Sequence, residues 1–277
     1  MHDIFCFTDI HGCRPLFDAI MNYCKKQDDE ATIIFCGDAC DRGPDGYTIM
    51  KELLENPKVI YLMGNHEDMF TRAAREIIEK FNFKNTDRDR VKTVLSACKA
   101  FDYKYAAIQD SLYNGGMPTL LDWIMDGMPM DFVEHIEQLP RTFSYEDKDF
   151  CHSGGVYQTF QRVSECEYEM TAPNLWDTDA IVWNRSALDI GWAPNRMCIF
   201  GHTPTPYLSD YIKIQVDKAQ PVKYASTSYP IYTGEKLDMD TGTIFTGKAY
   251  VLNVLTMRAQ GFELKNDEVE EIEVIQL

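Results

Sequence analysis

The chain has 277 residues, of which 45% are hydrophobic, so it can bury a large core and is not an intrinsically disordered chain. Its formal net charge is −17 at pH 7, from 27 basic and 44 acidic residues. Proteins that bind nucleic acid or anionic membrane surfaces usually present a basic face, so this charge disfavours both kinds of partner.

The cysteines and the N-terminus favour a cytoplasmic protein. Nine cysteines are an odd number, and their spacing is not that of a disulfide framework, which favours a reducing compartment. The first residues, MHDIFCFTDIHG, lack the basic region and long apolar region of a signal peptide. No apolar run approaches the roughly 20 residues that a membrane helix needs.

Strands and helices alternate in the first third of the chain. The apolar runs 3–8, 31–36 and 58–63 predict strands, with helices between them and a further helix at 67–81. Strands separated by helices favour parallel pairing with right-handed crossovers. In such open sheets, ligands bind beyond the carboxyl ends of the strands.

The rest of the chain is first helical and then rich in strands. The pattern predicts a helical insertion at about 82–140. No repeat or flexible linker interrupts the sequence, which favours a single domain over 1–277. The expected later strands are 142–146, 149–153, 181–183, 197–201, 211–217, 243–247, 248–256 and 269–277.

Polar, glycine-rich motifs follow the predicted strands. Glycine permits tight turns that expose neighbouring side chains at the strand ends. Mixed Asp, His and Asn ligands suit divalent ions such as Mn²⁺, Fe or Zn²⁺, and one bridging carboxylate could hold two such ions about 3.5–4 Å apart. The motifs are DIHG (9–12), GDACDRGP (37–44), GNHE (64–67), HSGG (152–155) and GHTP (201–204), and they contain four of the six histidines.

The order of these motifs resembles that of the calcineurin-like metallophosphoesterases, from residue 1 to about 205. GDACDRG together with GNHE resembles the serine/threonine protein phosphatase branch, and NGG (114–116) and VWNR (182–185) resemble its bacterial and phage members. The resemblance implies an α/β fold, namely a four-layer αββα sandwich with two central mixed sheets and a helical insertion.

The resemblance also implies two divalent metal ions, with Mn²⁺ expected and Fe or Zn²⁺ as alternatives. Asp38 would bridge the two ions. The implied ligands are Asp9, His11 and Asp38 for the first ion and Asp38, Asn65, His152 and His202 for the second.

Further residues match the family's catalytic and substrate-binding positions. His66 matches the general acid that protonates the leaving alkoxide, and Asp41 matches the carboxylate that orients this histidine. Arg42 matches a phosphate clamp, Arg185 is expected to be a second clamp, and Asn65 is also expected near the substrate. The implied reaction is in-line attack of a metal-bridging hydroxide on phosphorus.

The implied function is a phosphomonoesterase acting on phosphoserine or phosphothreonine in proteins or peptides, with phosphotyrosine and small phosphomonoesters as further candidates. A diadenosine tetraphosphate hydrolase is the main alternative, but that branch tends to carry GNHD and to lack the Asp of DRG. The sequence also leaves room for a broad phosphodiesterase and for an inactive binding module, although an inactive module would be expected to have lost a ligand or His66.

Several of these residues also have simple structural interpretations. Asp9 could cap a helix near Pro15, and Arg185 could be an ordinary surface residue. Glu67 is expected to support the metal-site loops by hydrogen bonds. Most cysteines near the motifs are expected to be buried, while Cys40 is a candidate for partial exposure and oxidation.

Overall fold

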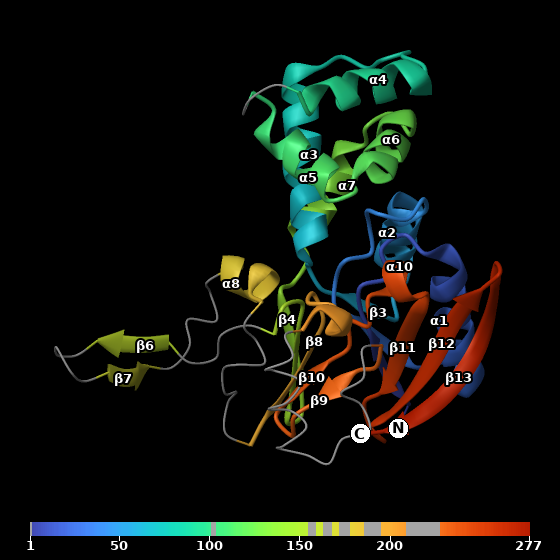
Figure 1. Ribbon diagram of the computed structural model, residues 1–277, viewed down its shortest axis with the longest axis vertical. Coiled ribbons are helices and arrows are strands. Elements are labelled where there is room, and N and C mark those ends of the chain that lie inside the picture. Colours follow the sequence, from blue (N-terminus) through green and yellow to red (C-terminus); the bar gives the residue numbers. More distant parts are fainter. Residues whose placement is uncertain are drawn as a thin grey trace.

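Two β-sheets face each other, and a bundle of helices rises above them (Figure 1). The computed structural model describes residues 2–100, 104–154, 159–162, 168–171, 178–185, 195–208 and 228–277. Within these residues no helix is both long enough and apolar enough to cross a bilayer.

The first sheet is mixed and has six strands in the order β13-β12-β11-β1-β2-β3. The three N-terminal strands pair in parallel, as predicted, and β11 joins β1 in antiparallel orientation. The carboxyl ends of β1–β3 therefore lie at one edge of the sheet. The strands are β1 (Ile4–Phe7), β2 (Thr32–Phe35), β3 (Val59–Tyr61), β11 (Lys248–Asn253), β12 (Arg258–Lys265) and β13 (Glu268–Gln276).

The second sheet is also mixed, with the order β4-β5-β8-β10-β9. Its central strands β5, β8 and β10 are parallel, and antiparallel strands close both edges. A separate hairpin pairs β6 (Thr159–Arg162) with β7 (Tyr168–Thr171). The sheet strands are β4 (Thr142–Tyr145), β5 (Lys148–Cys151), β8 (Met197–Phe200), β9 (Ile231–Tyr232) and β10 (Lys236–Asp238).

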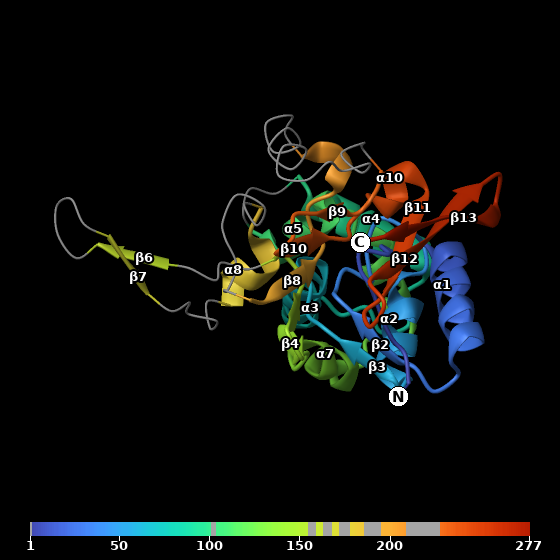
Figure 2. The ribbon, with the colours of Figure 1, turned by 90° about the horizontal axis from the view of Figure 1, so that it is seen from below.

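Side-chain alternation along the strands builds two cores. Phe5 and Phe7 of β1 belong to a core shared with the helices α1 (Arg14–Gln27) and α2 (Gly46–Glu55). Cys6, between them, belongs to the core that contains Phe150 and Ile199 of the second sheet. Successive residues of a strand point to opposite faces, so the first sheet is buried on both sides. Figure 2 shows α1 along the side of this sheet that faces away from the second sheet.

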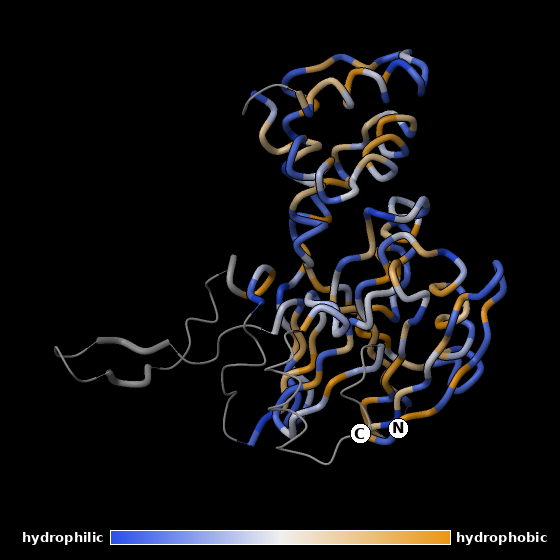
Figure 3. The backbone as a smooth tube through the Cα atoms, in the orientation of Figure 1, coloured by the Kyte–Doolittle hydropathy of each residue, from blue (hydrophilic) through white to orange (hydrophobic). Residues whose placement is uncertain are grey.

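Helices occupy the stretch predicted to be helical. α3 (Asn65–Lys80) starts at the sheet edge and rises into the bundle (Figure 1). Apolar residues of the bundle, such as Leu95 and Trp123, are fully buried and continue the first core, and Figure 3 shows hydrophobic stretches both here and in the strands. The remaining bundle helices are α4 (Arg88–Cys98), α5 (Ala106–Tyr113), α6 (Met117–Met125) and α7 (Met130–Glu137).

The α/β class and the two mixed sheets are confirmed, but two predicted strands are wrong. The run 181–183 ends the helix α8 (Thr178–Trp183), and 243–247 forms the one-turn helix α10 (Thr243–Thr246). Periodicity cannot separate such short apolar runs from strands. Two glycines limit α10 to one turn, because Gly242 and Gly247 have φ of 74° and 69° and turn the chain at both ends of the helix. Strands β6, β7, β9, β10 and β12 were not predicted, and 211–217 lies outside the described residues.

Candidate active site

The predicted site residues meet where strands of both sheets end. Asp9 and His11 follow β1, Asp38 follows β2, His152 follows β5 and His202 follows β8. Asn65 and His66 begin α3, directly after β3. All these side chains, and Asp41, are buried. The structure thus brings together residues that are far apart in sequence.

The loops that carry these residues have unusual backbone geometry. A positive φ is uncommon for residues other than glycine, and a cluster of such residues marks a site that the surrounding fold must enforce. Gly37, at φ 90°, could not be replaced by a larger residue, since an added Cβ would lie 2.7 Å from the backbone of Gly64. Six predicted site residues have φ between 45° and 74°: Asp9, His11, Asp38, Asp41, Arg42 and His202.

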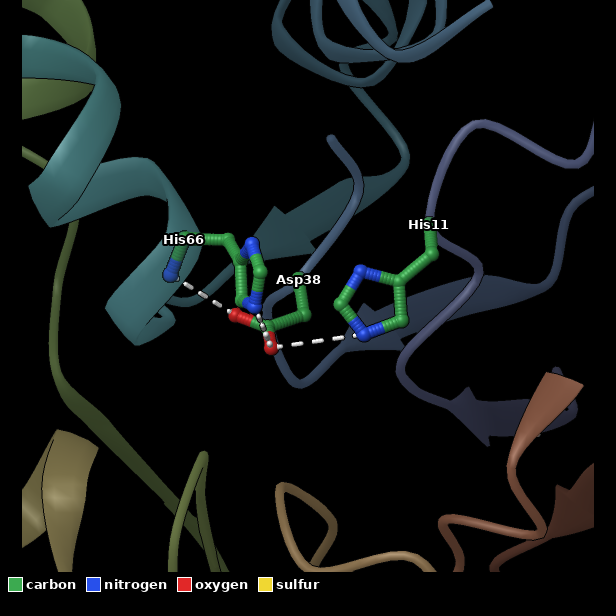
Figure 4. A group of neighbouring side chains, drawn as sticks. All are labelled: His11, Asp38 and His66. Carbon is green, nitrogen blue, oxygen red and sulfur yellow. Dashed lines mark hydrogen bonds and ion pairs between the residues drawn. The ribbon is translucent and has the colours of Figure 1, made fainter. Parts of the chain in front are cut away.

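Asp38 lies at the centre of the site. Its Oδ2 is 3.6 Å from Nε2 of His11 and 3.8 Å from Nε2 of His66, an arrangement visible in Figure 4. Its Oδ1 is 3.3 Å from Nε2 of His152. Among the described residues, Asp38 is shared by two groups that could each hold a metal ion, one with His11 and His66 and the other with His152 and His202. This position suits a bridging ligand.

The second group converges on Asn65. Its Oδ1 lies 2.9 Å from Nε2 of His152 and 2.8 Å from Nδ1 of His202. The other ring nitrogen of His152, Nδ1, is 2.8 Å from the carbonyl oxygen of Cys36, and that of His11 is 3.0 Å from the carbonyl oxygen of Cys40. Donation to these carbonyl groups fixes the tautomer, so each Nε2 is directed at the site as a ligand atom.

Asp9 lies at the edge of the first group. Its Oδ1 is 3.9 Å from Nε2 of His11, and its carboxylate accepts hydrogen bonds from the backbone N–H of His202 and from the hydroxyl group of Thr8. Burial raises the pKa of Asp9 to about 7. Its role as a ligand of the first ion stays a prediction.

The protonation states of the histidines follow from their surroundings. Burial and the positive charges of His66 and Arg42 lower the pKa of His11 well below its usual value. Burial and the charge of His152 lower the pKa of His202 to about 2. Burial alone would lower the pKa of His152 too, but the nearby Asp38 and Asp9 outweigh it and raise that pKa to about 10.

The site residues fit two divalent cations. Buried carboxylate, imidazole and amide groups converge on one point, which is costly unless a cation compensates them. His202 Nε2 is buried and has no hydrogen-bond partner among the residues that the structure describes. The donor set of oxygen and imidazole nitrogen suits Mn²⁺, Fe or Zn²⁺. The residues that would hold the ions are Asp9, His11, Asp38, Asn65, His152 and His202.

Glu67 holds two of the motif loops together. Its Oε2 accepts hydrogen bonds from the backbone N–H groups of Asp38, at 2.8 Å, and Gly64, at 2.9 Å. Its Oε1 accepts from the N–H of Ala39 and the hydroxyl group of Tyr61. The expected supporting role of Glu67 is therefore visible in its contacts.

His66, Asp41 and Arg42 form a connected group beside the candidate metal site. Nδ1 of His66 lies 2.8 Å from Oδ2 of Asp41. The guanidinium group of Arg42 lies 2.7 Å from Nε2 of His11 and 3.1 Å from Nε2 of His66. Arg185 is exposed, and its Nη1 donates to the carbonyl oxygen of His202 at 3.4 Å, so it lies at the rim of the site.

The helical insertion supports this group through contacts that sequence reasoning missed. The backbone N–H of Arg42 donates to the carbonyl oxygen of Gly115, and that of Asp41 donates to the hydroxyl group of Thr119. Gly115 belongs to the NGG motif, which was the available signal, whereas nothing in the sequence pointed to Thr119. The insertion therefore helps to shape the site.

Two of the simpler interpretations are not supported. Asp9 does not cap α1, because that helix begins at Arg14 and its N-cap residue is Cys13. The expectation that Cys40 is partly exposed is wrong: its side chain, within the loop that carries Asp38 and Asp41, is fully buried. All eight cysteines in the described part of the chain are free and buried.

The sequence of residues 2–206 matches the family model for the calcineurin-like phosphoesterases. The chain belongs to the calcineurin-like phosphoesterase family. This membership and the two groups of Asp and His residues indicate a metal-dependent hydrolase. No curated protein matches the sequence significantly.

Several solved structures have similar folds at low sequence identity. A provisionally assigned diadenosine tetraphosphatase is 13% identical, with a TM-score of 0.47 and coverage of 98% of this chain and 93% of its own. A metallophosphoesterase from Sphaerobacter thermophilus is 12% identical (TM-score 0.45; coverage 98% and 88%). A protein serine/threonine phosphatase from Saccharomyces cerevisiae is 13% identical (TM-score 0.45; coverage 100% and 81%).

Proposed function

We propose that this protein is a two-metal phosphomonoesterase of the serine/threonine protein phosphatase type. Its substrates would be phosphoserine or phosphothreonine in proteins or peptides, with phosphotyrosine and small phosphomonoesters as further candidates. The observation that carries the proposal is the pairing of His66 with Asp41 at 2.8 Å, directly beside Arg42 and both candidate metal groups.

His66 is suited to donate a proton to the leaving oxygen. Burial alone would lower the pKa of His66, but the charge of Asp38 and the hydrogen bond to Asp41 outweigh it, so the pKa is raised. The imidazolium form is thereby favoured near neutral pH. Asp41 accepts the hydrogen bond from Nδ1–H, which directs Nε2 toward the site and makes it the proton-donating atom.

Arg42 is suited to bind the phosphoryl oxygens. Its planar guanidinium group can bind two oxygens through two parallel N–H donors in a rigid fork, a fixed geometry that the point charge of an ammonium group lacks. Its nitrogens already lie on the side of His11 and His66 that faces the site. Two divalent ions held by the six ligand residues would supply an activated water molecule and would compensate charge on the phosphoryl group.

The proposal can be tested with a substrate panel and metal-loaded protein. The panel contains phosphoserine, phosphothreonine and phosphotyrosine peptides, p-nitrophenyl phosphate, its bis-ester and diadenosine tetraphosphate. We expect phosphate release from the monoesters to exceed turnover of the last two compounds. Preferred cleavage of diadenosine tetraphosphate or of the bis-ester would instead support a diadenosine tetraphosphate hydrolase or a phosphodiesterase. Binding of phosphate without any turnover would support the inactive module.

A further inference from the structure

An exposed pair of aromatic side chains lies beside the arginine of the site. Tyr207 and Phe245 are 64% and 57% exposed, and their ring centroids are 5.6 Å apart in an edge-to-face arrangement. The guanidinium carbon of Arg42 lies 5.7 Å from the centroid of Phe245. We call Tyr207 and Phe245 the aromatic pair. Large apolar side chains this exposed are costly in water, which makes them candidates for ligand contacts.

The aromatic pair is held by the fold although its rings are exposed. Tyr207 ends the short helix η1 (Thr205–Tyr207), which follows His202, and Phe245 lies in α10. The backbone N–H of Thr205 donates to the carbonyl oxygen of Asp240, and Asp240 in turn accepts from the N–H of Gly242. Loops from β8 and β10 are thus joined, which fixes the rings relative to the site.

The position of the aromatic pair places it near the leaving group of a bound phosphomonoester. Arg42 also contacts His66, so Phe245 and the proton donor flank the same guanidinium group. A phosphoryl group bound by Arg42 would carry its ester oxygen toward His66, and the group beyond that oxygen would pass the aromatic pair. A ring there could pack edge-to-face or offset against Phe245, as aromatic pairs prefer.

We propose that the aromatic pair binds an aromatic leaving group, so that, among the candidate substrates of the proposed phosphomonoesterase, the aryl ester phosphotyrosine is preferred to the alkyl esters phosphoserine and phosphothreonine. This inference rests on the proposed phosphomonoesterase function. A nucleobase is another aromatic group found on phosphate esters, but a ribose separates it from phosphorus, whereas an aryl ester would place its ring directly beside Arg42 and Phe245. Tyr207 and Phe245 would be specificity-determining residues for the same reaction.

A binding experiment separates this preference from catalysis. Affinities of phenylphosphonate, methylphosphonate and adenosine monophosphate are measured by calorimetry for the metal-loaded wild type, Phe245→Leu and Tyr207→Ala. Aromatic contacts of this kind change binding by roughly three- to tenfold. We expect Phe245→Leu and Tyr207→Ala each to lower the affinity for phenylphosphonate roughly three- to tenfold more than the affinity for methylphosphonate. The control variants Phe245→Tyr and Tyr207→Phe keep the rings and should keep the preference for phenylphosphonate.

Three outcomes would overturn the inference. The first is equal loss for both phosphonates, which would show that Phe245 acts only by positioning Arg42. The second is a wild type without preference for phenylphosphonate. The third is a loss confined to adenosine monophosphate, which would indicate a nucleobase site. A preference for phenylphosphonate in a protein that hydrolyses no monoester would support the aromatic site and contradict the proposed function. Phosphoserine and phosphotyrosine peptides of one sequence extend the comparison to kcat/KM.

Discussion

Asp38, in the loop after β2, and His66, in the first turn of α3, occupy different positions in the site. Each oxygen of Asp38 lies near an imidazole nitrogen, Oδ2 at 3.6 Å from Nε2 of His11 and Oδ1 at 3.3 Å from Nε2 of His152. His66 lies near the same carboxylate but also contacts Asp41, at a shorter distance of 2.8 Å. The geometry therefore supports a proton donor at His66, although its Nε2 is also close enough to join a metal group.

The substitution His66→Asn separates these two roles. We expect metal stoichiometry and affinity to be kept, because the six ligand residues are unchanged. Turnover of an alkyl phosphate should fall by about 10²–10⁴-fold, the usual contribution of a general acid. Turnover of p-nitrophenyl phosphate should fall much less, since nitrophenolate needs no proton to leave. Lost metal binding, or equal slowing of both substrates, would contradict the assignment.

Metal binding should release protons, because His152 and Asp9 are protonated to different extents without metal. The pKa values of about 10 for His152 and about 7 for Asp9 leave His152 protonated and Asp9 partly protonated at pH 7. Ligands must lose these protons, so loading should release roughly one to two protons per chain at pH 7 and the affinity should rise with pH.

The proton release can be measured by calorimetric titration of metal-stripped protein with Mn²⁺ in PIPES and in Tris. The two buffers take up protons with different heats, so the difference between the two heats of binding gives the number of protons released. The number released should decrease toward one as the pH is raised above 7, because Asp9 is then already ionised. An affinity that falls with rising pH would contradict this description of the site.

At the scale of elements, the sequence predicted the strand ends well and the short elements poorly. Motifs such as GDACDRG are local, so Asp38 and Asp41 could be placed directly after a strand. Helices α8 and α10 span only one or two turns, and their apolar residues do not distinguish a helix from a strand. The contact of Phe245 with Arg42 could not be predicted, because it depends on how the loops of two sheets meet.

The β10–α10 segment also buries two carboxyl groups that sequence reasoning missed. Asp238 and Asp240 are nearly inaccessible, and each has one oxygen without a hydrogen-bond partner in the described structure. Burial raises the pKa of both groups well above the usual value. At these two positions the folded protein binds more protons than the unfolded chain, so the stability that the two groups contribute to the metal-free protein should be lost as the pH rises above about 4.

The substitution Asp240→Asn should remove part of this loss. Asn keeps an oxygen that can accept the hydrogen bond from Gly242 and has no proton to lose. In EDTA-treated protein we expect the free energy of unfolding of the variant, relative to wild type, to increase from pH 5 to pH 8, because the raised pKa of Asp240 makes its ionisation costly in the folded wild type. Urea unfolding measures it, with the exposed Asp29→Asn as control. A difference that does not change with pH would show that Asp240 does not titrate in this range.

At the scale of the whole molecule, a net charge of −17 surrounds a site proposed to bind anions. The far field should repel phosphopeptides, while Arg42 and the two cations attract them only at short range. Salt screens the long-range part first, because the Debye length falls from about 30 Å at 0.01 M to about 8 Å at 0.15 M.

The value of kcat/KM for an acidic phosphopeptide should therefore rise as NaCl is increased across this range at fixed metal concentration. A neutral-flanked phosphopeptide serves as the control and should respond less. A value that falls with salt for both peptides would indicate net attraction and contradict the repulsive field.

The sequence composition also led to two expectations about the setting of the protein. We expect no nucleic-acid or membrane partner, and we expect a cytoplasmic location; both stay predictions.

The most direct test of the central claim is p-nitrophenyl phosphate hydrolysis by metal-stripped protein during titration with Mn²⁺. Two groups of ligands share Asp38, so the rate should rise to its full value at two ions per chain. Asp38→Asn should abolish the rate at the same metal concentration. No turnover of this monoester with Mn²⁺, Zn²⁺ or Fe²⁺ would contradict the proposal that the protein is a two-metal phosphomonoesterase.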